Sequence, residues 1–225
     1  MSPSHSLGKG LFITFEGTEG AGKSTLMREV AKVLTAQGHR ESDIVLTREP
    51  GGTPVAEQIR KTILDHEMSP WTELFLYEAA RAEHLAVTIL PALAQGKLVL
   101  CDRFADSSLA YQAHARGLTW KTVKQLNAIA TQGLSPDATI LIDIDPAVGL
   151  GRAQDRNRFE EEGLKFQKKV RAGFLKSRSE KPSRWIVIKP GTKTPEKLAT
   201  EVLLKLEKKL KAKKFSSWAK ARKSQ

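Results

Sequence analysis

The chain has 225 residues, of which 40% are hydrophobic and 28% charged, with a formal net charge of +12, values that suit a globular protein with a sizeable core. No apolar run approaches the ~20 residues of a membrane span, and residues 1–10 lack the apolar stretch of a secretory signal. The single cysteine, Cys101, excludes an internal disulfide framework and predicts an unreactive core thiol in a reducing, cytoplasmic protein.

The positive charge is concentrated near the C-terminus. Residues 205–225 hold nine Lys or Arg and one Glu, and therefore carry +8 of the net +12. We expect a single domain over residues 1–212, followed by a basic tail over residues 213–225. Such a tail can bind nucleic acid or an anionic surface, but a solvated helix end is the more common form of such a charge run, and we favour it.

The first motif along the chain is a glycine-rich loop between an apolar run and a helical stretch. Residues 17–24 read Gly-Thr-Glu-Gly-Ala-Gly-Lys-Ser, which is the G-x-x-x-x-G-K-[ST] pattern of a phosphate-binding loop. An ordinary glycine-rich turn is the alternative, and the flanking strand and helix disfavour it. Lys23 would reach the β- and γ-phosphates of a nucleotide, and Ser24 would be a ligand of Mg²⁺. The expected phosphate-binding residues are Gly17, Thr18, Glu19, Gly20, Ala21, Gly22, Lys23, Ser24 and Thr25.

Short apolar runs alternate with helical stretches through the rest of the chain. Runs that are apolar on both faces and rich in Val, Ile and Leu are typical of parallel strands between layers of helices. The pattern predicts strands at residues 11–16, 44–47, 97–102, 138–144 and 185–188. It predicts helices at about residues 23–36, 54–65, 70–95, 104–115, 119–132, 146–155, 159–178 and 195–212, with Pro91 kinking the third. We therefore expect a three-layer α/β fold of the P-loop NTPase type, with a five-stranded parallel sheet flanked by helices.

Charged residues follow the second and third predicted strands, at the edge of the sheet where ligands bind in such folds. Arg48 opens the turn Arg-Glu-Pro-Gly-Gly-Thr and could bind a second phosphate, although it could also simply pair with an acid. The third strand leads into Asp102-Arg103-Phe104. Asp102 would hold Mg²⁺ through water, and Arg103 would add positive charge at the transferring phosphoryl group. Asp143, at the end of the fourth strand, is the second candidate for the metal.

A polar segment rich in arginine follows the fourth strand. Residues 151–160 contain Arg152, Arg156 and Arg158 and begin with a glycine. Such a segment suits a mobile lid that closes on a nucleotide and brings cations to developing charge. A solvated, charged helix face is the alternative, and the phosphate loop favours the lid.

Taken together, these segments resemble the thymidylate kinases, which phosphorylate dTMP to dTDP with ATP. The matching pieces are residues 15–25, 47–53, 77–81, 102–112 and 143–146, the last leading to the arginine-rich segment. The piece Arg-Glu-Pro-Gly-Gly-Thr is specific to this family among phosphate-loop kinases. The resemblance implies the P-loop kinase fold, ATP and Mg²⁺ as phosphoryl donor and cofactor, dTMP as substrate, and a homodimer through the helices near residues 70–95 and 119–132.

The resemblance also implies roles for single residues. Lys23, Arg103 and an arginine of the lid would stabilise the transferring phosphoryl group. Arg48 and Arg103 would hold the dTMP phosphate, and Glu19 would approach the sugar and the Mg²⁺. The expected base and sugar pocket consists of Tyr77, which would stack on thymine, Arg81, which would bond its carbonyl edge, and Ser107, Ser108, Tyr111 and Gln112.

Two positions bear on the subgroup and on the fit to the family. Gly20 stands where one subgroup carries arginine, so the catalytic arginine is expected from the lid, as in the bacterial-type subgroup. Arg152, Arg156 and Arg158 are the candidates, and Arg156 is favoured. Tyr77 stands where better-known members carry Phe, and the lid is a few residues short.

Three other functions stay open. A nucleoside monophosphate kinase for another base would share the fold. A phosphate-loop ATPase could use the basic tail to bind nucleic acid, but it would not need the Arg48 and Arg81 segments. A nucleotide-binding module without catalysis is disfavoured because Lys23, Ser24 and Asp102 are all present.

Overall fold

The computed structural model describes residues 10–152 and 158–210. The basic tail at residues 213–225 and Arg156 lie outside these ranges, as does the side chain of Arg158. Within them, five strands form one parallel sheet in the order β2-β3-β1-β4-β5, which confirms the predicted sheet. The strands are β1 (Leu11–Glu16), β2 (Ile44–Arg48), β3 (Leu98–Asp102), β4 (Ala138–Ile142) and β5 (Trp185–Ile188).

Most predicted helices are confirmed to within a few residues, and α2 has its predicted bounds. The α-helices are α1 (Lys23–Ala36), α2 (Pro54–Asp65), α3 (Pro70–His84), α4 (Leu90–Ala94), α5 (Ala105–Ser108), α6 (Trp120–Ala130), α7 (Pro146–Arg152), α8 (Arg158–Glu161), α9 (Gly163–Glu180) and α10 (Pro195–Lys209). Two π-helical segments are η2 (Leu85–Ile89) and η3 (Leu109–Ala115), and two 3₁₀ turns are η1 (Glu41–Asp43) and η4 (Pro182–Arg184). The helices predicted at 70–95 and 104–115 are therefore each divided by a change of helix type.

At the predicted kink, Pro91 directly follows a change of helix type, from the π-helical segment η2 to α4. A proline inside a helix lacks an N–H donor, and its ring collides with the carbonyl group four residues earlier. Pro91 lies in the first turn of α4, where an N–H is not needed, and the wider turns of η2 join α4 to α3. None of the helices in the described ranges is long and apolar enough to cross a membrane.

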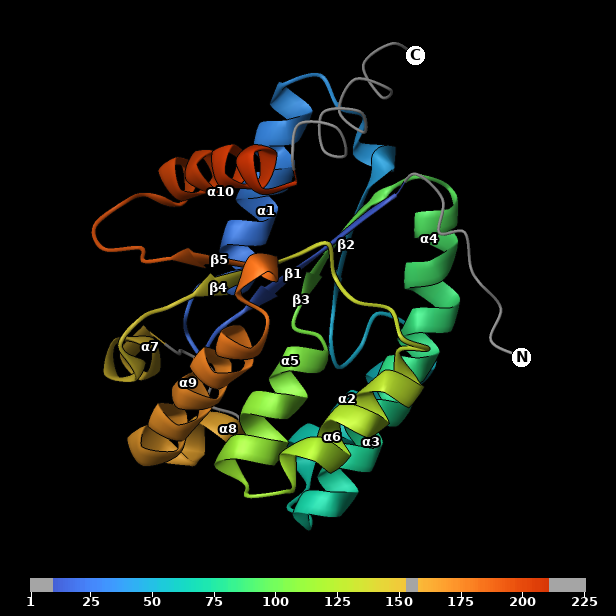
Figure 1. The fold of residues 1–225 in the computed structure, drawn as a ribbon, viewed down its shortest axis with the longest axis vertical. Coiled ribbons are helices and arrows are strands. Elements are labelled where there is room, and N and C mark those ends of the chain that lie inside the picture. Colours follow the sequence, from blue (N-terminus) through green and yellow to red (C-terminus); the bar gives the residue numbers. More distant parts are fainter. Residues whose placement is uncertain (1–9, 153–157, 211–225) are drawn as a thin grey trace.

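Different helices cover the two faces of the sheet because alternate strand residues point to opposite sides. In β1, Leu11, Ile13 and Phe15 belong to the core that includes residues of α1 and α10. Phe12 belongs to a second core, with residues of η2 and α4. Figure 1 shows α1 and α10 together on one side of the sheet and α3, α5 and α9 on the other, which is the expected three-layer arrangement.

The prediction that every strand is buried on both faces is wrong for β2. This strand lies at the edge of the sheet, and the side chain of Leu46 is 44% exposed. The apolar composition of a strand does not reveal whether it is central or at an edge, since that depends on the strand order. β4 ends at Ile142, so Asp143 lies just beyond the strand.

Candidate active site

The phosphate loop lies between β1 and α1, as predicted. Gly17, Gly20 and Gly22 have φ values of 151°, 66° and 86°, in the region that residues with a Cβ rarely adopt. Gly20 also packs directly on α7, and a Cβ at this position would overlap the carbonyl group of Gly149. The loop therefore has no room for a side chain at Gly20.

Lys23 folds back over the loop. Its Nζ donates a hydrogen bond to the carbonyl oxygen of Thr18 at 2.9 Å, and the residue is 7% exposed. Burial, followed by repulsion from Arg103, lowers the pKa of Lys23 despite nearby carboxylates. An ammonium group that is partly desolvated and bound to one neutral carbonyl is well suited to exchange that carbonyl for a phosphate oxygen.

Ser24 and Asp102 meet where α1 begins and β3 ends. The Ser24 hydroxyl donates to Asp102 Oδ2, and the buried Oδ1 has no hydrogen-bond partner among the described residues. A hydroxyl beside a carboxylate oxygen without a partner fits Mg²⁺, which takes oxygen ligands from one or two protein groups and completes its shell with phosphates and water. In the described part of the chain, no group of three or more His, Cys, Asp or Glu side chains could hold a metal.

Asp143, the second candidate for the metal, is already paired. Its Oδ1 and Oδ2 accept hydrogen bonds from Arg171 of α9 at 2.6 and 3.1 Å. If Asp143 were to bind Mg²⁺, its bidentate pair with Arg171 would have to break, at a cost in free energy. Asp102 would not bear this cost, because its Oδ1 has no partner among the described residues. The structure therefore favours Asp102.

Arg103 joins the turn after β3 to the phosphate loop. Its Nη2 donates to Glu19 Oε1 at 2.6 Å, and the Tyr111 hydroxyl donates to the same oxygen at 2.8 Å. The guanidinium also lies over the Tyr111 ring, 5.0 Å from its centroid. Burial acts to raise the pKa of Glu19, but Arg103, Lys23 and Tyr111 outweigh it, so that the pKa lies below its ordinary value. The two segments are thus joined by an ionised pair.

A cavity of about 280 Å³ lies between the loop and the ends of β2 and β3. Its charged lining consists of Lys23, Arg48, Arg60 and Arg103 with Glu19, Glu49 and Asp102. Arg60 was missed by the sequence analysis. It lies on α2, and its Nη1 donates to the carbonyl oxygen of Pro50 at 3.1 Å. Its side chain therefore contacts the turn that precedes the helix. Burial, followed by repulsion from Arg48, lowers the pKa of Arg60.

The position of Arg48 is compatible with both interpretations of the sequence, as the partner of an acid and as a phosphate-binding residue. Its Nη2 donates to Glu57 Oε2 at 2.9 Å, which is the pairing with an acid. Glu57 Oε1 accepts the N–H of Gly52 at 3.0 Å, and this second bond fixes the carboxylate beside the turn. The Arg48 side chain nevertheless stays 53% exposed and lines the cavity, so it can also reach an anion there.

Among the predicted site residues whose side chains the structure describes, Arg81 is the most deeply buried one that carries a charge, with 1% exposure. Its Nε donates to Glu49 Oε2 at 2.8 Å and its Nη1 donates to Glu78 Oε1 at 2.8 Å. Burial acts to lower the pKa of Arg81, but the two carboxylates raise it above its ordinary value. Among the described residues, Nη2 donates one hydrogen bond, to the carbonyl oxygen of Phe104 at 3.3 Å.

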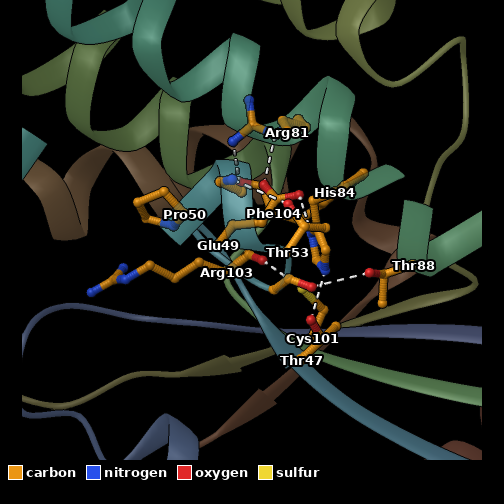
Figure 2. Close-up of polar contacts among 12 residues, drawn as sticks. Thr47, Glu49, Pro50, Thr53, Arg81, His84, Thr88, Cys101, Arg103 and Phe104 are labelled. Carbon is orange, nitrogen blue, oxygen red and sulfur yellow. Dashed lines mark hydrogen bonds and ion pairs between the residues drawn. The ribbon is translucent and has the colours of Figure 1, made fainter. Parts of the chain in front are cut away.

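His84 extends this network and was not foreseen from the sequence. Figure 2 shows Glu49 between Arg81 and His84, with Thr47 on the other side of the imidazole. His84 Nδ1 lies 3.1 Å from Glu49 Oε1, and Nε2 lies 2.6 Å from Thr47 Oγ1. A Cβ on Gly52 would overlap the imidazole, so the turn after β2 packs directly against α3.

Aromatic rings gather where the base pocket was predicted. Tyr77 is half-buried, and the Phe159 ring centroid lies 6.4 Å from that of Tyr77 and 5.8 Å from that of Tyr111. Ser108 and Gln112 are each 1% exposed. Ser108 accepts a hydrogen bond from Arg81 Nη1 at 3.0 Å, and Gln112 donates to Glu73 at 2.8 Å.

A second cavity, of about 490 Å³, runs from the loop to the turn after β5. Arg152, at the end of α7, lines it together with Gly22, Pro190 and Lys193. Neither Pro190 nor Lys193 was predicted to belong to the site, because the turn after β5 carries no motif. Arg158 begins α8, and Arg156 lies outside the described residues, so the order of the three lid arginines stays a prediction.

The loop with its lysine, the hydroxyl–carboxylate pair and the cationic cavity at the strand ends define a phosphoryl-transfer enzyme of the P-loop class. The family model for thymidylate kinase matches residues 15–202, and the chain belongs to the thymidylate kinase family. It is 49% identical over 191 residues to the thymidylate kinase of Geotalea uraniireducens, covering 80% of this chain and 88% of that protein. It is 48% identical over 205 residues to that of Geobacter sulfurreducens, covering 86% and 94%. The crystal structure of thymidylate kinase from Ehrlichia chaffeensis superposes with a TM-score of 0.73 at 33% identity, covering 88% of this chain and 98% of that one.

Substituting Arg81→Ala is expected to lower the free energy of unfolding by about 3–5 kcal/mol, because it leaves Glu49 and Glu78 buried without their partner. Arg48→Ala is the matched control, since its ion pair with Glu57 is exposed and is expected to contribute no more than about 1 kcal/mol. Urea unfolding of both variants measures the difference. Equal losses would contradict the buried network.

Proposed function

We propose that the protein transfers the γ-phosphoryl group of ATP to dTMP in the cavity between the phosphate loop and the ends of β2 and β3. Thymidylate kinases phosphorylate dTMP to dTDP, and the chain has this activity, with ATP as donor. The observation that supports the location is the grouping of Lys23, Arg48, Arg60 and Arg103 around one cavity beside the loop. Two nucleotides that repel each other need such a density of positive charge at the point where their phosphates meet.

ATP would lie along the loop, with its phosphates on the backbone N–H groups and the remainder of the nucleotide in the second cavity, near Pro190 and Lys193. Ser24 and Asp102 would hold Mg²⁺, because they are hydrogen-bonded to each other at the end of the loop and one carboxylate oxygen is without a partner among the described residues. Bound there, Mg²⁺ would neutralise charge on the phosphates.

The dTMP phosphate would bind Arg48, Arg60 and Arg103, which face the loop across the smaller cavity. The base end would lie at Tyr77, and the sugar near Glu19 and Tyr111. Arg81 would offer the second hydrogen of Nη2 to the carbonyl edge of thymine. Ser107, Ser108 and Gln112 would border this pocket, and the hydrogen bonds of Ser108 to Arg81 and of Gln112 to Glu73 would fix its wall.

Transfer would proceed in line, from the γ-phosphate to a dTMP phosphate oxygen, without a covalent enzyme intermediate. The attacking phosphate is already anionic, so no strong general base is required. Lys23 and Arg103 would stabilise charge on the transferring group, together with an arginine of the lid at residues 151–160, for which Arg156 is favoured over Arg152 and Arg158. Closure of the lid would exclude water and suppress hydrolysis of ATP.

A coupled assay with Mg-ATP and a panel of dTMP, dUMP, dCMP, dGMP and AMP tests the function. We expect the highest kcat/KM with dTMP and no turnover when EDTA removes the metal. Faster turnover of another monophosphate would contradict dTMP as the substrate. Hydrolysis of ATP that DNA or RNA stimulates, without any phosphoryl acceptor, would support the alternative of an ATPase.

Substituting Lys23→Met should lower kcat at least about a hundredfold, because it removes the cation at the β- and γ-phosphates while preserving the length of the side chain. The fold should survive, since the side chain of Lys23 donates a hydrogen bond only to the carbonyl oxygen of Thr18 in the part of the chain that the structure describes. Lys32→Met on the same helix is the control, as its side chain is 71% exposed. An unchanged kcat with folded Lys23→Met protein would remove the loop lysine from the mechanism.

We also propose a homodimer that forms through α3 and α6. Trp71 and Phe75 of α3 are 42% and 55% exposed with their rings in contact, and Ile129 of α6 is 74% exposed. Exposed apolar side chains on neighbouring helices favour a protein interface.

Light scattering on a sizing column should give twice the chain mass of 24.9 kDa for the wild type. Phe75→Lys should give the monomer because it places a charge in the interface. Leu204→Lys on α10 should remain dimeric, since Leu204 is equally exposed (55%) but lies on the other side of the sheet. A monomeric wild type would contradict the proposal.

A further inference from the structure

Glu16, the last residue of β1, is a buried carboxylate that none of the roles above uses. The residue is 0% exposed and directly precedes the phosphate loop. Its Oε1 accepts the backbone N–H of Phe104 at 2.8 Å, and its Oε2 accepts the hydroxyl of Ser107 at 2.7 Å. One carboxylate on the strand that leads to the loop therefore binds two points of the segment that follows β3.

That segment carries Arg103 in a backbone conformation that non-glycine residues avoid. Its φ is 72°, in the left-handed region, which costs free energy unless neighbouring contacts hold it. The N–H of Arg103 donates to the carbonyl oxygen of Phe15 at 2.9 Å, and the next N–H, of Phe104, goes to Glu16. Without that acceptor a buried N–H would be left unpaired, so Glu16 stabilises the turn in this conformation.

The other anchor of the turn is apolar. Phe104 is fully buried, and its ring meets that of Phe12 edge to face, with centroids 4.9 Å apart. The turn is thus held at its backbone by Glu16 and at its side chain by the core. From there the Arg103 guanidinium reaches Glu19 Oε1 at 2.6 Å and the carbonyl oxygen of Gly17 at 3.1 Å.

We infer that Glu16 is a positioning residue for phosphoryl transfer: it fixes Arg103 relative to the phosphate loop by binding the Phe104 N–H and the Ser107 hydroxyl. The inference rests on the proposed function, in which Arg103 binds the dTMP phosphate. Glu16 is not among the described residues that line the cavity beside the loop, so it acts through Arg103 and not on the substrate. Glu16 is also bonded covalently to Gly17, the first residue of the phosphate loop. One residue therefore links the loop that would bind ATP to the arginine that would bind the dTMP phosphate.

The residues around Glu16 indicate that the positions of its two carboxyl oxygens matter more than its negative charge. Its ionisable neighbours are Asp106 of α5, Arg103 in the turn, Lys23 of α1 and Cys101 of β3. Burial, followed by repulsion from Asp106, raises the pKa of Glu16 to about 8, against the lowering effect of its hydrogen bonds and of Arg103. Near neutral pH the carboxyl group can therefore carry a proton while Oε1 still accepts from Phe104. Glutamine is a close substitute for that form, whereas aspartate keeps the carboxyl group but is one methylene shorter.

The test compares Glu16→Gln with Glu16→Asp in the full chain, measuring kcat and KM for dTMP and for ATP. Glu16→Gln is expected to keep the KM for dTMP within about threefold of the wild type, because the amide still reaches both partners. Glu16→Asp should raise that KM at least about tenfold and leave the KM for ATP within about twofold, because the shorter side chain releases the turn but not the loop. A role in charge alone would give the reverse order of the two variants.

Thr14→Val is the matched control. Thr14 lies two residues earlier in β1 on the same face, is 0% exposed, and its hydroxyl bonds that of Thr139 at 3.1 Å. The control should lose stability without a change in the KM for dTMP. A KM for dTMP that is unchanged in Glu16→Asp, raised equally in Glu16→Gln, or raised as much in Thr14→Val would overturn the inference.

Two further results separate the possible failures. If Glu16→Asp does not fold, Ser107→Ala removes one of the two contacts, and a KM for dTMP that stays at the wild-type value in this variant also overturns the inference. Absence of dTMP turnover in the wild type would contradict the proposed function, and the inference with it. Normal wild-type turnover with an unaffected Glu16→Asp variant would contradict the inference alone.

Discussion

Two nucleotides that each carry several negative charges must meet end to end, and their repulsion has to be balanced where their phosphates touch. The site has four cations near the carboxyl ends of β1, β2 and β3, where one cavity is lined by Lys23, Arg48, Arg60 and Arg103. Burial, followed by repulsion from neighbouring cations, lowers the pKa values of Lys23 and Arg60. Each is therefore tied to an oxygen of the protein: Lys23 and Arg60 to carbonyl groups, Arg48 and Arg103 to carboxylates. The positive charge is assembled before a substrate arrives, so binding does not have to organise it.

Buried carboxylates hold this arrangement in place from behind. Glu49 binds Arg81 and His84 of α3 and so fixes the turn that carries Arg48, while Glu16 fixes the turn that carries Arg103. Both turns follow strands that adjoin in the sheet, since β3 lies between β2 and β1. The order of the strands therefore brings Arg48 and Arg103 to the same side of the loop, and the buried contacts keep them there. In the Glu49–Arg81 pair, a buried charge that lost its partner would be costly, which makes the contacts of this network cooperative.

The sequence predicts the parts of the protein whose physical signal is local. The placement of the glycines predicts the loop at residues 17–24, and the apolar runs predict the strands. The bounds of α2 follow from the Thr53–Pro54 start of the helix, which Thr53 Oγ1 caps. The edge position of β2 depends on the strand order, and the π-helical segments η2 and η3 depend on packing, so neither is visible in a periodic pattern. Arg60, His84 and Glu16 were missed because their partners lie on other elements, up to 91 residues away in the chain for Glu16. The resemblance to the thymidylate kinases predicted that Arg81 binds the base, but only the structure shows how deeply this residue is buried.

The proposed function requires two anionic nucleotides to meet in the cavity between the phosphate loop and the strand ends. A crystal structure with dTMP and a non-hydrolysable ATP analogue would show whether they do. We expect the triphosphate along the backbone of residues 20–25 and the dTMP phosphate within hydrogen-bond distance of Arg48 and Arg103, with thymine beside Tyr77. A thymine nucleotide bound outside that cavity, or with its phosphate turned away from the loop, would contradict the proposed function.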